Sequence, residues 1–383
     1  MVHQTQYDIV IVGAGPAGAN LARLIDSRRH RVLLLDGSDM QPKVCAGLLS
    51  PDAQKLLTRY RISLPEQAFV GPQLSSVRVI DLDCRRVRHF RRSYLNLDRA
   101  AYDRYLLDLV PSSVDILSAR CVHIEKKDGA YALQLRHADG AQSQVRAHHI
   151  VGADGASSVV RASLFGDRTI QKYVSIQQWF SAETIDPYYS CVFDAATSES
   201  CSWIFFKGGR LVFGGAFAPH GCRAAFEAQK QKLIERGIVP AHVLKHPLKT
   251  EACRVSRPRL NKGICHGAGG AYLVGEAAGF ISPSSFEGIS YALRSGGALA
   301  SAFNKKRDTS DILRAYRKKT RPLRLKVISK CLKRPLMYLP FLRKIILQTG
   351  LGQQNNYKNG GFTLLLIRMF NTTFVGTGVL DCP

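Results

Sequence analysis

The first 36 residues of the chain predict a strand, a helix and a second strand. Residues 7–12 (YDIVIV) form a short apolar run, and residues 32–36 (VLLLD) form another that ends in an acid. Between these runs, apolar residues recur at the spacing of one helix face. A glycine-rich turn, GAGPAG at 13–18, separates the first strand from the helix. This order of elements is typical of a βαβ unit that binds a dinucleotide.

The residues of this turn have separate roles in such a unit. Gly13 permits the tight turn, Gly15 lets the backbone approach a pyrophosphate, and Gly18 lets the helix pack on the strand. Pro16 and Ala17 begin the helix, whose N-terminus favours negative charge. A structural glycine-rich turn without a ligand is the alternative, and the strand, the spacing and the terminal acid make it the weaker interpretation.

Acidic residues follow three of the predicted strands. Asp36 ends the second strand, where a carboxylate accepts hydrogen bonds from an adenosine ribose and disfavours the 2′-phosphate of NADP. Asp154 lies in the GADG turn at 152–155, and Glu276 lies in the GEAAG turn at 275–279. For Asp154, an Asx-turn cap that touches no ligand is the alternative.

Taken in order, the GxGxxG, GADG and GxAAG turns resemble those of FAD oxidoreductases with the p-hydroxybenzoate hydroxylase fold. The resemblance implies that FAD binds between the first and last turns, with Glu276 on its ribityl or pyrophosphate portion, where the family usually has Asp. It also implies that Arg99 reaches the FAD and that the backbone of Val122 passes the adenine. A surface arginine is the alternative for Arg99.

The segment after the third turn is where the resemblance places the flavin ring. Pro283 marks a turn, and Gly288 and Ile289 open an apolar helix. Backbone N–H groups at a helix start carry partial positive charge, so they suit the flavin N1/O2 edge, which becomes anionic on reduction. Such a site would raise the reduction potential of the flavin. A helix capped by Ser284 or Ser285 is compatible with the same residues and needs no ligand.

Two further motifs are similar to those of geranylgeranyl reductases within this fold group. KVCAGLLSP at 43–51 resembles their K-P-C-G-G-like loop, which implies that Lys43, Cys45 and Gly47 lie near the flavin. CSWIFFKGGRLVFGGAF at 201–217 resembles their YxWxFPK…GxG signature, with Trp203 in register. A closer resemblance within the same family is to the bacterial CbrA-type flavoproteins, through KVCAGLLSPDAQ at 43–54, VGADGASSVVR at 151–161 and GEAAGFISPSSFEGISYALRS at 275–295. The chain departs from the two reductase motifs at Val44, Ala46, Cys201 and Phe206.

Cys45 and Trp203 are the candidate catalytic residues. Cys45 is a candidate acid for protonating a substrate carbon or a contact of the flavin edge, and an inert apolar filler is the alternative. Trp203 alternates with Phe205 on a predicted strand, so the two side chains share one face. That face would be either the wall of an apolar substrate pocket or a sheet core. Lys207, at the following turn, is expected to face solvent unless the substrate bears a phosphate.

The chain is long enough for two domains, and its scattered flavin motifs require that these interleave. It has 383 residues, of which 45% are hydrophobic, so it can bury a large core. We expect an α/β fold with a Rossmann-like FAD-binding domain, a sheet-rich α+β substrate domain and a basic helical C-terminal region. The expected boundaries are 1–66, 95–165 and 265–304 for the first, 67–94 and 166–264 for the second, and 305–383 for the third.

The cysteines and the first residues indicate the compartment. Ten cysteines occur without a CxxC motif or Cys/His ligand spacing, which favours a reducing compartment over a disulfide scaffold or a metal site. The first apolar run is the predicted strand rather than a signal peptide, so we expect a cytoplasmic protein.

Positive charge is concentrated near the C-terminus. The net charge is +25, and residues 305–344 contain fifteen Lys or Arg against Asp308 and Asp311. Apolar residues interspersed among them predict basic amphipathic helices, which adsorb to anionic lipid. We therefore expect this region to place the protein on the inner face of the cytoplasmic membrane. A nucleic acid partner, for which no binding motif is present, and a solvated helix face without a partner are the alternatives.

Together these features predict an FAD-dependent reductase with an apolar, isoprenoid or other lipid substrate. An external donor, NADPH or a reduced carrier, would reduce the FAD, which would pass a hydride to a C=C bond while Cys45, a tyrosine or water protonates the other carbon. One alternative is a flavin monooxygenase or halogenase acting on an aromatic compound, although the WxWxIP motif of halogenases is missing. The other is a flavin-binding membrane protein without fast turnover. The sequence does not indicate the oligomeric state.

Overall fold

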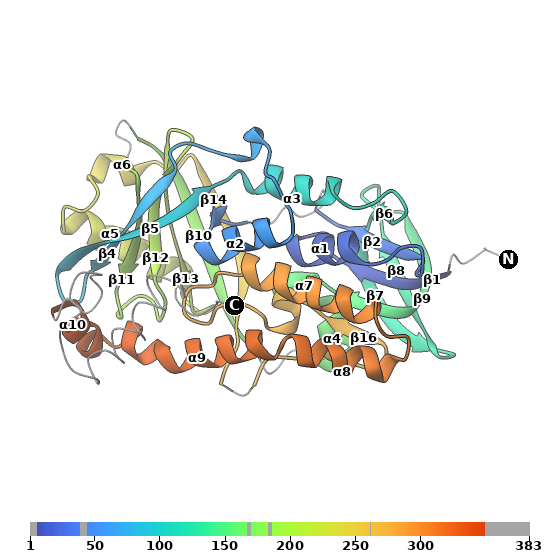
Figure 1. Cartoon of the computed structure of the whole chain (residues 1–383). Coiled ribbons are helices and arrows are strands. Elements are labelled where there is room, and N and C mark those ends of the chain that lie inside the picture. Colours follow the sequence, from blue (N-terminus) through green and yellow to red (C-terminus); the bar gives the residue numbers. More distant parts are fainter. Residues whose placement is uncertain (1–5, 39–43, 167–169, 183–185, 261, 349–383) are drawn as a thin grey trace. The chain divides into compact units, whose positions relative to one another are not determined.

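Two sheets organise the chain, each in its own compact unit. The computed structural model describes residues 6–38, 44–166, 170–182, 186–260 and 262–348. One unit comprises residues 1–45, 99–171 and 256–329, and the other comprises residues 46–98, 172–255 and 330–383. The fold is α/β, as predicted, and the elements are labelled in Figure 1.

The first unit is built on parallel strands. β1 (Gln6–Val12) lies between β2 (Val32–Asp36) and β9 (Gln142–Gly152), and β6 (Asp115–Ser118) and β16 (Ala271–Leu273) extend the sheet on either side. Parallel strands covered on both faces are apolar along their length, and Ile9, Val10 and Ile11 of β1 are fully buried. The predicted strand–helix–strand order is confirmed.

Three further strands complete this sheet. β15 (Gly267–Ala268) pairs antiparallel with β16. β8 (Ala130–Arg136) pairs antiparallel with β9, and β7 (Arg120–Lys127) pairs antiparallel with β8. The helices of the unit are α1 (Pro16–Leu24), α3 (Arg99–Asp108), α4 (Val159–Phe165), α7 (Ile289–Phe303) and α8 (Thr309–Lys319), with η2 (Gly155–Ser157) and η3 (Gly275–Ala278) as short 3₁₀ turns.

Helices α1 and α7 come from opposite ends of the sequence and pack closely. Asn20 of α1 is buried and its Nδ2 donates a hydrogen bond to the carbonyl of Leu293 on α7 (2.8 Å). A Cβ added to Gly296 would lie 2.4 Å from the carbonyl oxygen of Ala17. This contact brings the glycine-rich turn before α1 into the same unit as the segment that leads into α7.

The second unit contains a mixed, largely antiparallel sheet of eight strands, in the order β14-β10-β13-β12-β11-β4-β5-β3. In chain order the strands are β3 (Leu48–Leu49), β4 (Leu74–Asp81), β5 (Arg86–Asn96), β10 (Gln171–Ser181), β11 (Tyr188–Phe193), β12 (Ser202–Lys207), β13 (Arg210–Phe217) and β14 (Lys249–Arg257). The helices are α2 (Pro51–Arg59), η1 (Glu66–Ala68), α5 (Cys222–Glu235), α6 (Ala241–Lys245), the C-terminal part of α9 (Arg321–Tyr338), and α10 (Pro340–Gln348).

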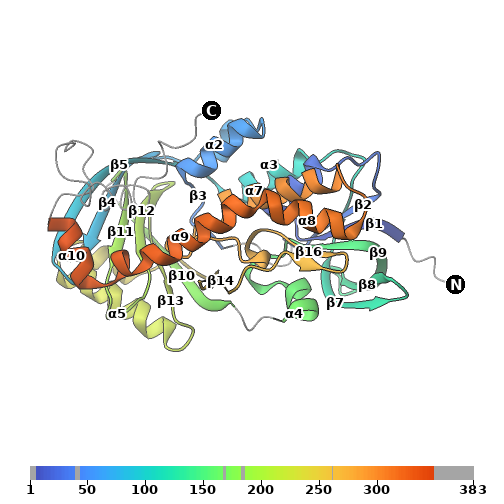
Figure 2. The same cartoon turned by 60° about the horizontal axis from the view of Figure 1, so that its bottom comes forward.

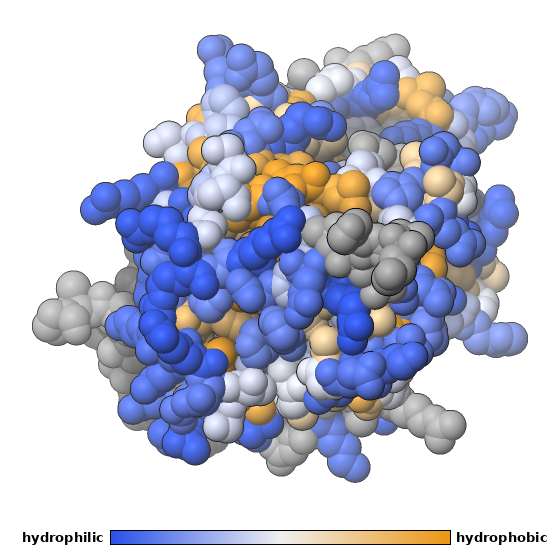
Figure 3. Space-filling view, turned by 90° about the vertical axis from the view of Figure 1, so that its right-hand side faces the viewer, coloured by the Kyte–Doolittle hydropathy of each residue, from blue (hydrophilic) through white to orange (hydrophobic). Residues whose placement is uncertain are grey.

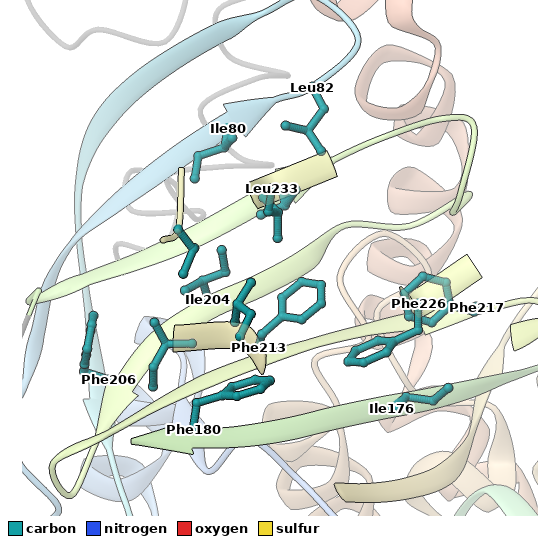
Figure 4. Packing of buried hydrophobic residues seen from close by; sticks show 14 residues of the cluster. Ile80, Leu82, Ile176, Phe180, Ile204, Phe206, Phe213, Phe217, Phe226 and Leu233 are labelled. Atoms are coloured by element: carbon teal, nitrogen blue, oxygen red, sulfur yellow. The ribbon is translucent and has the colours of Figure 1, made fainter. Parts of the chain in front are cut away.

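One face of this sheet is covered by α5 and α6 (Figure 2). Phe213 of β13 stacks on Phe226 of α5 with a centroid separation of 4.9 Å, and Phe217 meets the same ring edge-on. Figure 4 shows these rings together with Phe180 and Leu233 in one apolar cluster. Burial of this cluster is the main apolar contribution to the stability of this side of the unit.

The opposite face is covered at one end by the C-terminal helices. Met337 of α9 and Ile346 and Leu347 of α10 are buried against strand residues such as Val79 and Phe193. Arg343 of α10 is also buried, and its guanidinium is ion-paired with Asp81 of β4 and with Asp83 just after it. Residues 330–348 are thus part of the sheet unit, whereas the sequence predicted a separate C-terminal region from residue 305.

The division into units differs from the predicted boundaries at a second place. Residues 46–66 were expected in the FAD-binding domain, but β3 pairs with β5 through Leu48 and Asn96 in the second unit. Residues 305–329 belong to the first unit, since Tyr316 of α8 is buried there and donates a hydrogen bond to the carbonyl of Leu273 (2.8 Å).

Candidate functional site

The glycine-rich turn joins β1 to α1 with little space to spare. Gly13 has a φ of +106°, and its N–H donates to the carbonyl of Leu35 (3.0 Å). A Cβ on Gly18 would lie 1.9 Å from the carbonyl oxygen of Gly13, so only glycine lets the helix approach the turn. Gly15 is the N-cap of α1, with Pro16 and Ala17 following, and a Cβ there would meet nothing within 4 Å. Gly15, which has open space beside it, is therefore the glycine that the sequence predicted to lie next to a pyrophosphate.

The three acidic candidates have different environments. Asp36 ends β2, and its Oδ1 accepts a hydrogen bond from the N–H of Ser38 (2.9 Å). Glu276 uses Oε1 to accept from the N–H of Ser256 (2.7 Å). Both carboxylates therefore have backbone partners that fix their orientation.

Asp154 both caps a helix and retains an unpaired oxygen. Its Oδ2 accepts from the N–H of Val159 at the start of α4 (2.7 Å), so the predicted capping alternative accounts for this oxygen. Its Oδ1 is buried and has no hydrogen-bond partner within the described ranges. Burial raises the pKa of this carboxyl group, and hydrogen bonds from Ser158 and the α4 backbone act in the opposite direction. An unpaired buried acceptor suits a ligand donor.

The N-terminus of α7 is capped by a residue that the sequence did not suggest. Glu287 accepts hydrogen bonds from the N–H of Ser290 (2.8 Å) and from its hydroxyl (2.7 Å). The expected caps, Ser284 and Ser285, instead hydrogen-bond to Ser282. The signal was available, because a carboxylate directly before a helix is favoured by the partial positive charge at the helix N-terminus.

The residues expected near the flavin ring lie in and after this turn. Pro283 is buried, whereas Gly288 and Ile289 are half-buried at the first positions of α7. A Cβ on Gly288 would be no closer than 3.8 Å to a neighbouring atom, so space remains beside the helix start. Because Ser290 N–H is used by Glu287, it does not remain for a ligand.

Arg99 is buried rather than on the surface. It begins α3, its side chain is 12% exposed, and its Nε lies 2.9 Å from Asp103 Oδ1. Burial lowers the pKa of Arg99, but the Asp103 carboxylate and a hydrogen bond with the thiol of Cys45 outweigh this effect and raise it overall. The surface-arginine alternative is wrong. Cys45 has a cationic partner, which an apolar filler would not need.

Val122 occupies an irregularity in β7. The register with β8 shifts between Cys121 and His123, so Val122 has no partner across the strand pair, and its side chain is 40% exposed. A bulge exposes backbone groups that a regular ladder would use. This geometry is compatible with the predicted backbone contact to an adenine.

Gly47 and Lys207 lie against each other in the second unit. Lys207 does not face solvent. Lys207 is 7% exposed, and its Nζ donates to the carbonyl of Ala46 (2.9 Å) and to that of Leu97. Gly47 has a φ of +70°, and a Cβ there would lie 2.4 Å from Lys207 Nζ. The expectation of a solvent-facing lysine was wrong because backbone carbonyls satisfy the buried ammonium group. Lys43 lies outside the described residues.

Trp203 belongs to a partly exposed aromatic face of the second sheet. Trp203 of β12 pairs with Cys191 of β11 and with Gly214 of β13. Phe205, also on β12, pairs with Val212 of β13. We call this face the aromatic face; it is formed by Leu74, Tyr94, Gln177, Trp179, Tyr189, Trp203, Phe205 and Val212. Phe205 and Val212 are fully buried, whereas both tryptophans are half-buried. The sheet-core interpretation is therefore confirmed for Phe205, and the pocket wall at Trp203 stays a prediction.

Comparisons with known proteins identify the family. A protein-family model described as an FAD binding domain matches residues 102–330. The chain is 39% identical over 350 residues to Protein CbrA of Escherichia coli O6:H1, covering 90% of this chain and 93% of that protein. The chain belongs to the FAD binding domain family. It is a flavoprotein of the class that contains flavin-dependent oxidoreductases and monooxygenases.

Solved structures of this flavoprotein class share the fold. A geranylgeranyl bacteriochlorophyll reductase-like protein from Thermoplasma acidophilum has a TM-score of 0.77 at 20% identity, covering 97% of each chain. PqsL, a probable FAD-dependent monooxygenase from Pseudomonas aeruginosa, has a TM-score of 0.66 at 18% identity, covering 90% of this chain and 100% of that one. At these identities the likeness shows the fold alone.

The described residues fit FAD in the first unit of the flavoprotein. Gly15 leaves space beside a helix N-terminus, which suits a pyrophosphate. Asp154 Oδ1 is a buried acceptor without a partner in the described part of the chain, and FAD carries several hydroxyl and N–H donors. These residues would hold FAD together with Asp36, Glu276 and the start of α7.

Two polar residues of the flavoprotein, Gln177 and Glu251, were not predicted as site residues from the sequence. Gln177 and Glu251 lie beside Trp179, and Glu251 Oε2 accepts hydrogen bonds from Gln177 Nε2 (2.7 Å) and Trp179 Nε1 (2.8 Å). The alternation of SIQQWF would have placed Gln177 and Trp179 on one face. Their shared partner, Glu251 on β14, could not be predicted in this way, because it depends on the order of the strands in the sheet and alternation within one strand does not reveal that order.

Other reactive side chains of the flavoprotein are dispersed. None of the nine cysteines within the described ranges forms a disulfide bond. Among the same residues, no group of three or more His, Cys, Asp or Glu side chains is placed to hold a metal ion. No helix in the described part of the chain is long and apolar enough to cross a membrane.

Proposed function

We propose that this flavoprotein reduces a carbon–carbon double bond of an apolar, isoprenoid substrate, with electrons from an external donor such as NADPH or a reduced carrier. Bound FAD would supply the hydride to one carbon of the double bond. The remaining tasks fall to residues of the chain: holding the alkene, excluding water and delivering a proton to the second carbon.

The hydrogen bond between Lys207 and Ala46 carries this proposal. Two segments resemble geranylgeranyl reductases, 43–51 and 201–217, and nothing in their sequences requires them to meet. Lys207 at the end of β12 donates to the carbonyl of Ala46, the residue that directly follows Cys45 (2.9 Å). Within the second unit, the lysine therefore ties Ala46 to the end of the strand that carries Trp203, and this meeting of the two motifs supports a shared role for them.

Cys45 is the proposed proton donor. Its thiol is hydrogen-bonded to the buried guanidinium of Arg99. A thiol that gives up a proton becomes a thiolate, and an adjacent cation stabilises that product. Arg99 is itself held by Asp103 (2.9 Å and 3.0 Å), so it would act as a positioning residue.

The aromatic face is the proposed surface for the alkene. Trp179, Tyr189 and Trp203 are half-buried, with Phe205 and Val212 fully buried beneath them. Apolar contact with such a face is worth about 25 cal/mol for each Å² of substrate area removed from water. This surface would bind an isoprenoid chain without requiring charged groups.

The C-terminal helices are the proposed membrane contact. Leu332 of α9 and Leu339, between α9 and α10, are 59% and 53% exposed, and Phe341 and Ile345 of α10 are 72% and 40% exposed. Lysine and arginine residues are interspersed among them. Figure 3 looks onto the right-hand side of Figure 1, where β1 and β2 lie and not α10; that face is mostly hydrophilic, with apolar residues in separate patches. Exposed apolar side chains beside cations suit an anionic lipid surface, from which an isoprenoid substrate would be drawn.

Anaerobic flavin reoxidation tests the proposed reaction. The purified yellow protein is reduced with dithionite without oxygen, and a polyprenyl lipid or an aromatic compound is added. Reoxidation of the flavin by the polyprenyl lipid, with a product two daltons heavier, is the expected result. Reoxidation that requires both oxygen and the aromatic compound would establish a monooxygenase instead. A Cys45→Ala variant should bind FAD normally and reoxidise more slowly, with a matched Cys222→Ala variant unchanged.

A further inference from the structure

Two polar side-chain atoms on the aromatic face have no hydrogen-bond partner among the described residues. They are Nε1 of Trp203 and Oε1 of Gln177, and both atoms are shielded from solvent. Gln177 as a whole is only 1% exposed. A buried polar group left unpaired is destabilising, so such groups in a native protein usually meet a water or a ligand.

The two side chains flank a single glycine. Gly214 of β13 pairs with Gln177 on β10 and with Trp203 on β12, so the three residues form one row across the sheet. A Cβ on Gly214 would lie 2.5 Å from Trp203 Nε1 and 2.8 Å from the Cβ of Gln177. The indole N–H therefore lies over the glycine, next to the glutamine side chain.

The orientation of the Gln177 amide is fixed by Glu251. Glu251 Oε2 lies 2.7 Å from Gln177 Nε2 and also accepts from Trp179 Nε1. A carboxylate only accepts hydrogen bonds, so the amide nitrogen must face it and the amide oxygen must point elsewhere. The row thus presents one fixed donor, from Trp203, and one fixed acceptor, from Gln177.

We propose that this pair binds a hydroxyl group carried by the otherwise apolar substrate. Trp203 Nε1 donates a hydrogen bond to the hydroxyl oxygen, and Gln177 Oε1 accepts the hydroxyl hydrogen. A hydroxyl group satisfies both atoms at once because it is donor and acceptor together. The proposal rests on the proposed function in taking the ligand to be the substrate, and it adds that the substrate is an alcohol rather than a hydrocarbon.

The charge next to the pair favours a neutral group. Glu251 is hydrogen-bonded directly to Gln177, and its Oε1 lies 2.6 Å from Lys249 Nζ. Burial raises the pKa of Glu251, but hydrogen bonds from Lys249, Gln177 and Trp179 outweigh it and lower the pKa overall. The carboxylate is therefore ionised at neutral pH, where it would repel a phosphate or diphosphate held by Gln177.

Binding of three ligands that share one chain tests the proposal without any turnover. Geranylgeraniol, the C20 hydrocarbon that lacks its hydroxyl, and geranylgeranyl diphosphate are titrated into the oxidised holoprotein in one detergent. The two tryptophans of the chain, Trp179 and Trp203, both lie on the aromatic face and report binding by fluorescence. We expect the alcohol to bind more tightly than either of the other two by up to about tenfold, a factor that corresponds to about 1.4 kcal/mol and to the upper net contribution of one hydrogen bond.

Variants separate the pair from its surroundings. Gln177→Met and Trp203→Phe should each remove most of the preference for the alcohol and leave hydrocarbon affinity within about twofold. The control is Gln178→Met, because that neighbour lies on the other face of β10 with its amide bonded to Thr250 and Lys230. Flavin content and near-ultraviolet circular dichroism show that each variant is folded.

The results that would overturn the hydroxyl site differ from the result that would refute the proposed reductase. Equal affinity for alcohol and hydrocarbon in the wild type would overturn the hydroxyl site, as would a preference that survives in Gln177→Met. The pair would then hold only water. Alcohol-specific binding without reduction of any double bond would instead leave this inference standing and refute the reductase.

Discussion

Lys207 donates a hydrogen bond to the backbone carbonyl of Ala46, a residue 161 positions earlier in the chain (2.9 Å). The lysine is buried, and its second acceptor is the carbonyl of Leu97. A buried ammonium group is tolerated only when its donors are used. One side chain therefore ties the loop after Cys45 and the end of β5 to the end of β12.

Replacing this lysine should destabilise the second unit. Lys207→Met keeps the length of the side chain but leaves the carbonyls of Ala46 and Leu97 without their donor. We expect the free energy of unfolding to fall by about 1–3 kcal/mol, measured by urea denaturation with tryptophan fluorescence, which reports on this unit. The exposed Lys305→Met is the control. Equal midpoints for the two variants would contradict the proposed anchoring.

Gly15 and Gly18 should separate ligand binding from folding. Gly15→Ala adds a methyl group where no atom lies within 4 Å, so thermal unfolding of the apoprotein should change little. The same methyl group would occupy the space for a pyrophosphate, so we expect FAD affinity to fall at least about tenfold. Gly18→Ala should instead unfold the unit, because its Cβ would lie 1.9 Å from a carbonyl oxygen. Flavin absorbance and calorimetry measure the two effects, and normal FAD affinity in Gly15→Ala would remove that glycine from the site.

Arg343 should be essential to the attachment of α10. Arg343→Met would leave Asp81 buried without a cation, since Arg343 Nη2 lies 3.2 Å from Asp81 Oδ1. Removing one partner of a buried ion pair costs about 3–5 kcal/mol. The double variant Arg343→Met with Asp81→Asn removes the stranded charge, so it should recover part of that loss. Chemical denaturation measures both, and a double variant no more stable than the single one would argue against a stranded carboxylate.

The sequence predicted features that depend on neighbouring residues better than those that depend on distant ones. The βαβ unit and the close packing of Gly18 follow from local spacing and turn chemistry. Lys207 and Arg343 were not predicted as buried, because their partners lie 161 and 262 positions away and depend on strand order. Arg99 was suggested by resemblance, but its burial with Asp103 became visible only in the folded chain.

His266 should make the first unit acid-sensitive. It is 9% exposed and shares a hydrogen bond with Thr320 Oγ1 (2.8 Å). Burial, followed by the charges of Arg317 and Arg324, lowers the pKa of His266 to about 4. The unfolded chain, with a pKa of about 6.5, binds this proton more readily, so stability is lost as the pH falls from about 6.5 towards 4.

The His266 contribution can be measured by difference. A shift of this size corresponds to a loss of about 3 kcal/mol once the pH is below the folded pKa. His266→Gln keeps a hydrogen-bonding group and has no titrating proton, so its stability should fall less steeply than that of the wild type between pH 6.5 and pH 4.5. Urea denaturation across this range gives the two slopes, and parallel slopes would show that His266 does not bind a proton on unfolding.

The exposed apolar residues at the junction of α9 and α10 should determine membrane binding. Leu339→Ser with Phe341→Ser removes two side chains that are 53% and 72% exposed, so the fold should be retained. We expect the affinity for vesicles of anionic phospholipid, measured by flotation, to fall at least about tenfold, because each apolar side chain that is fully buried contributes about 1.5–3 kcal/mol and 1.4 kcal/mol corresponds to a factor of ten. The control Val87→Ser changes an apolar residue of β5 that is 51% exposed. Binding to anionic vesicles should also weaken with salt, since screening acts on the lysine and arginine contribution. Flotation that survives the double variant but disappears in salt would mean that charge alone holds the protein to the lipid.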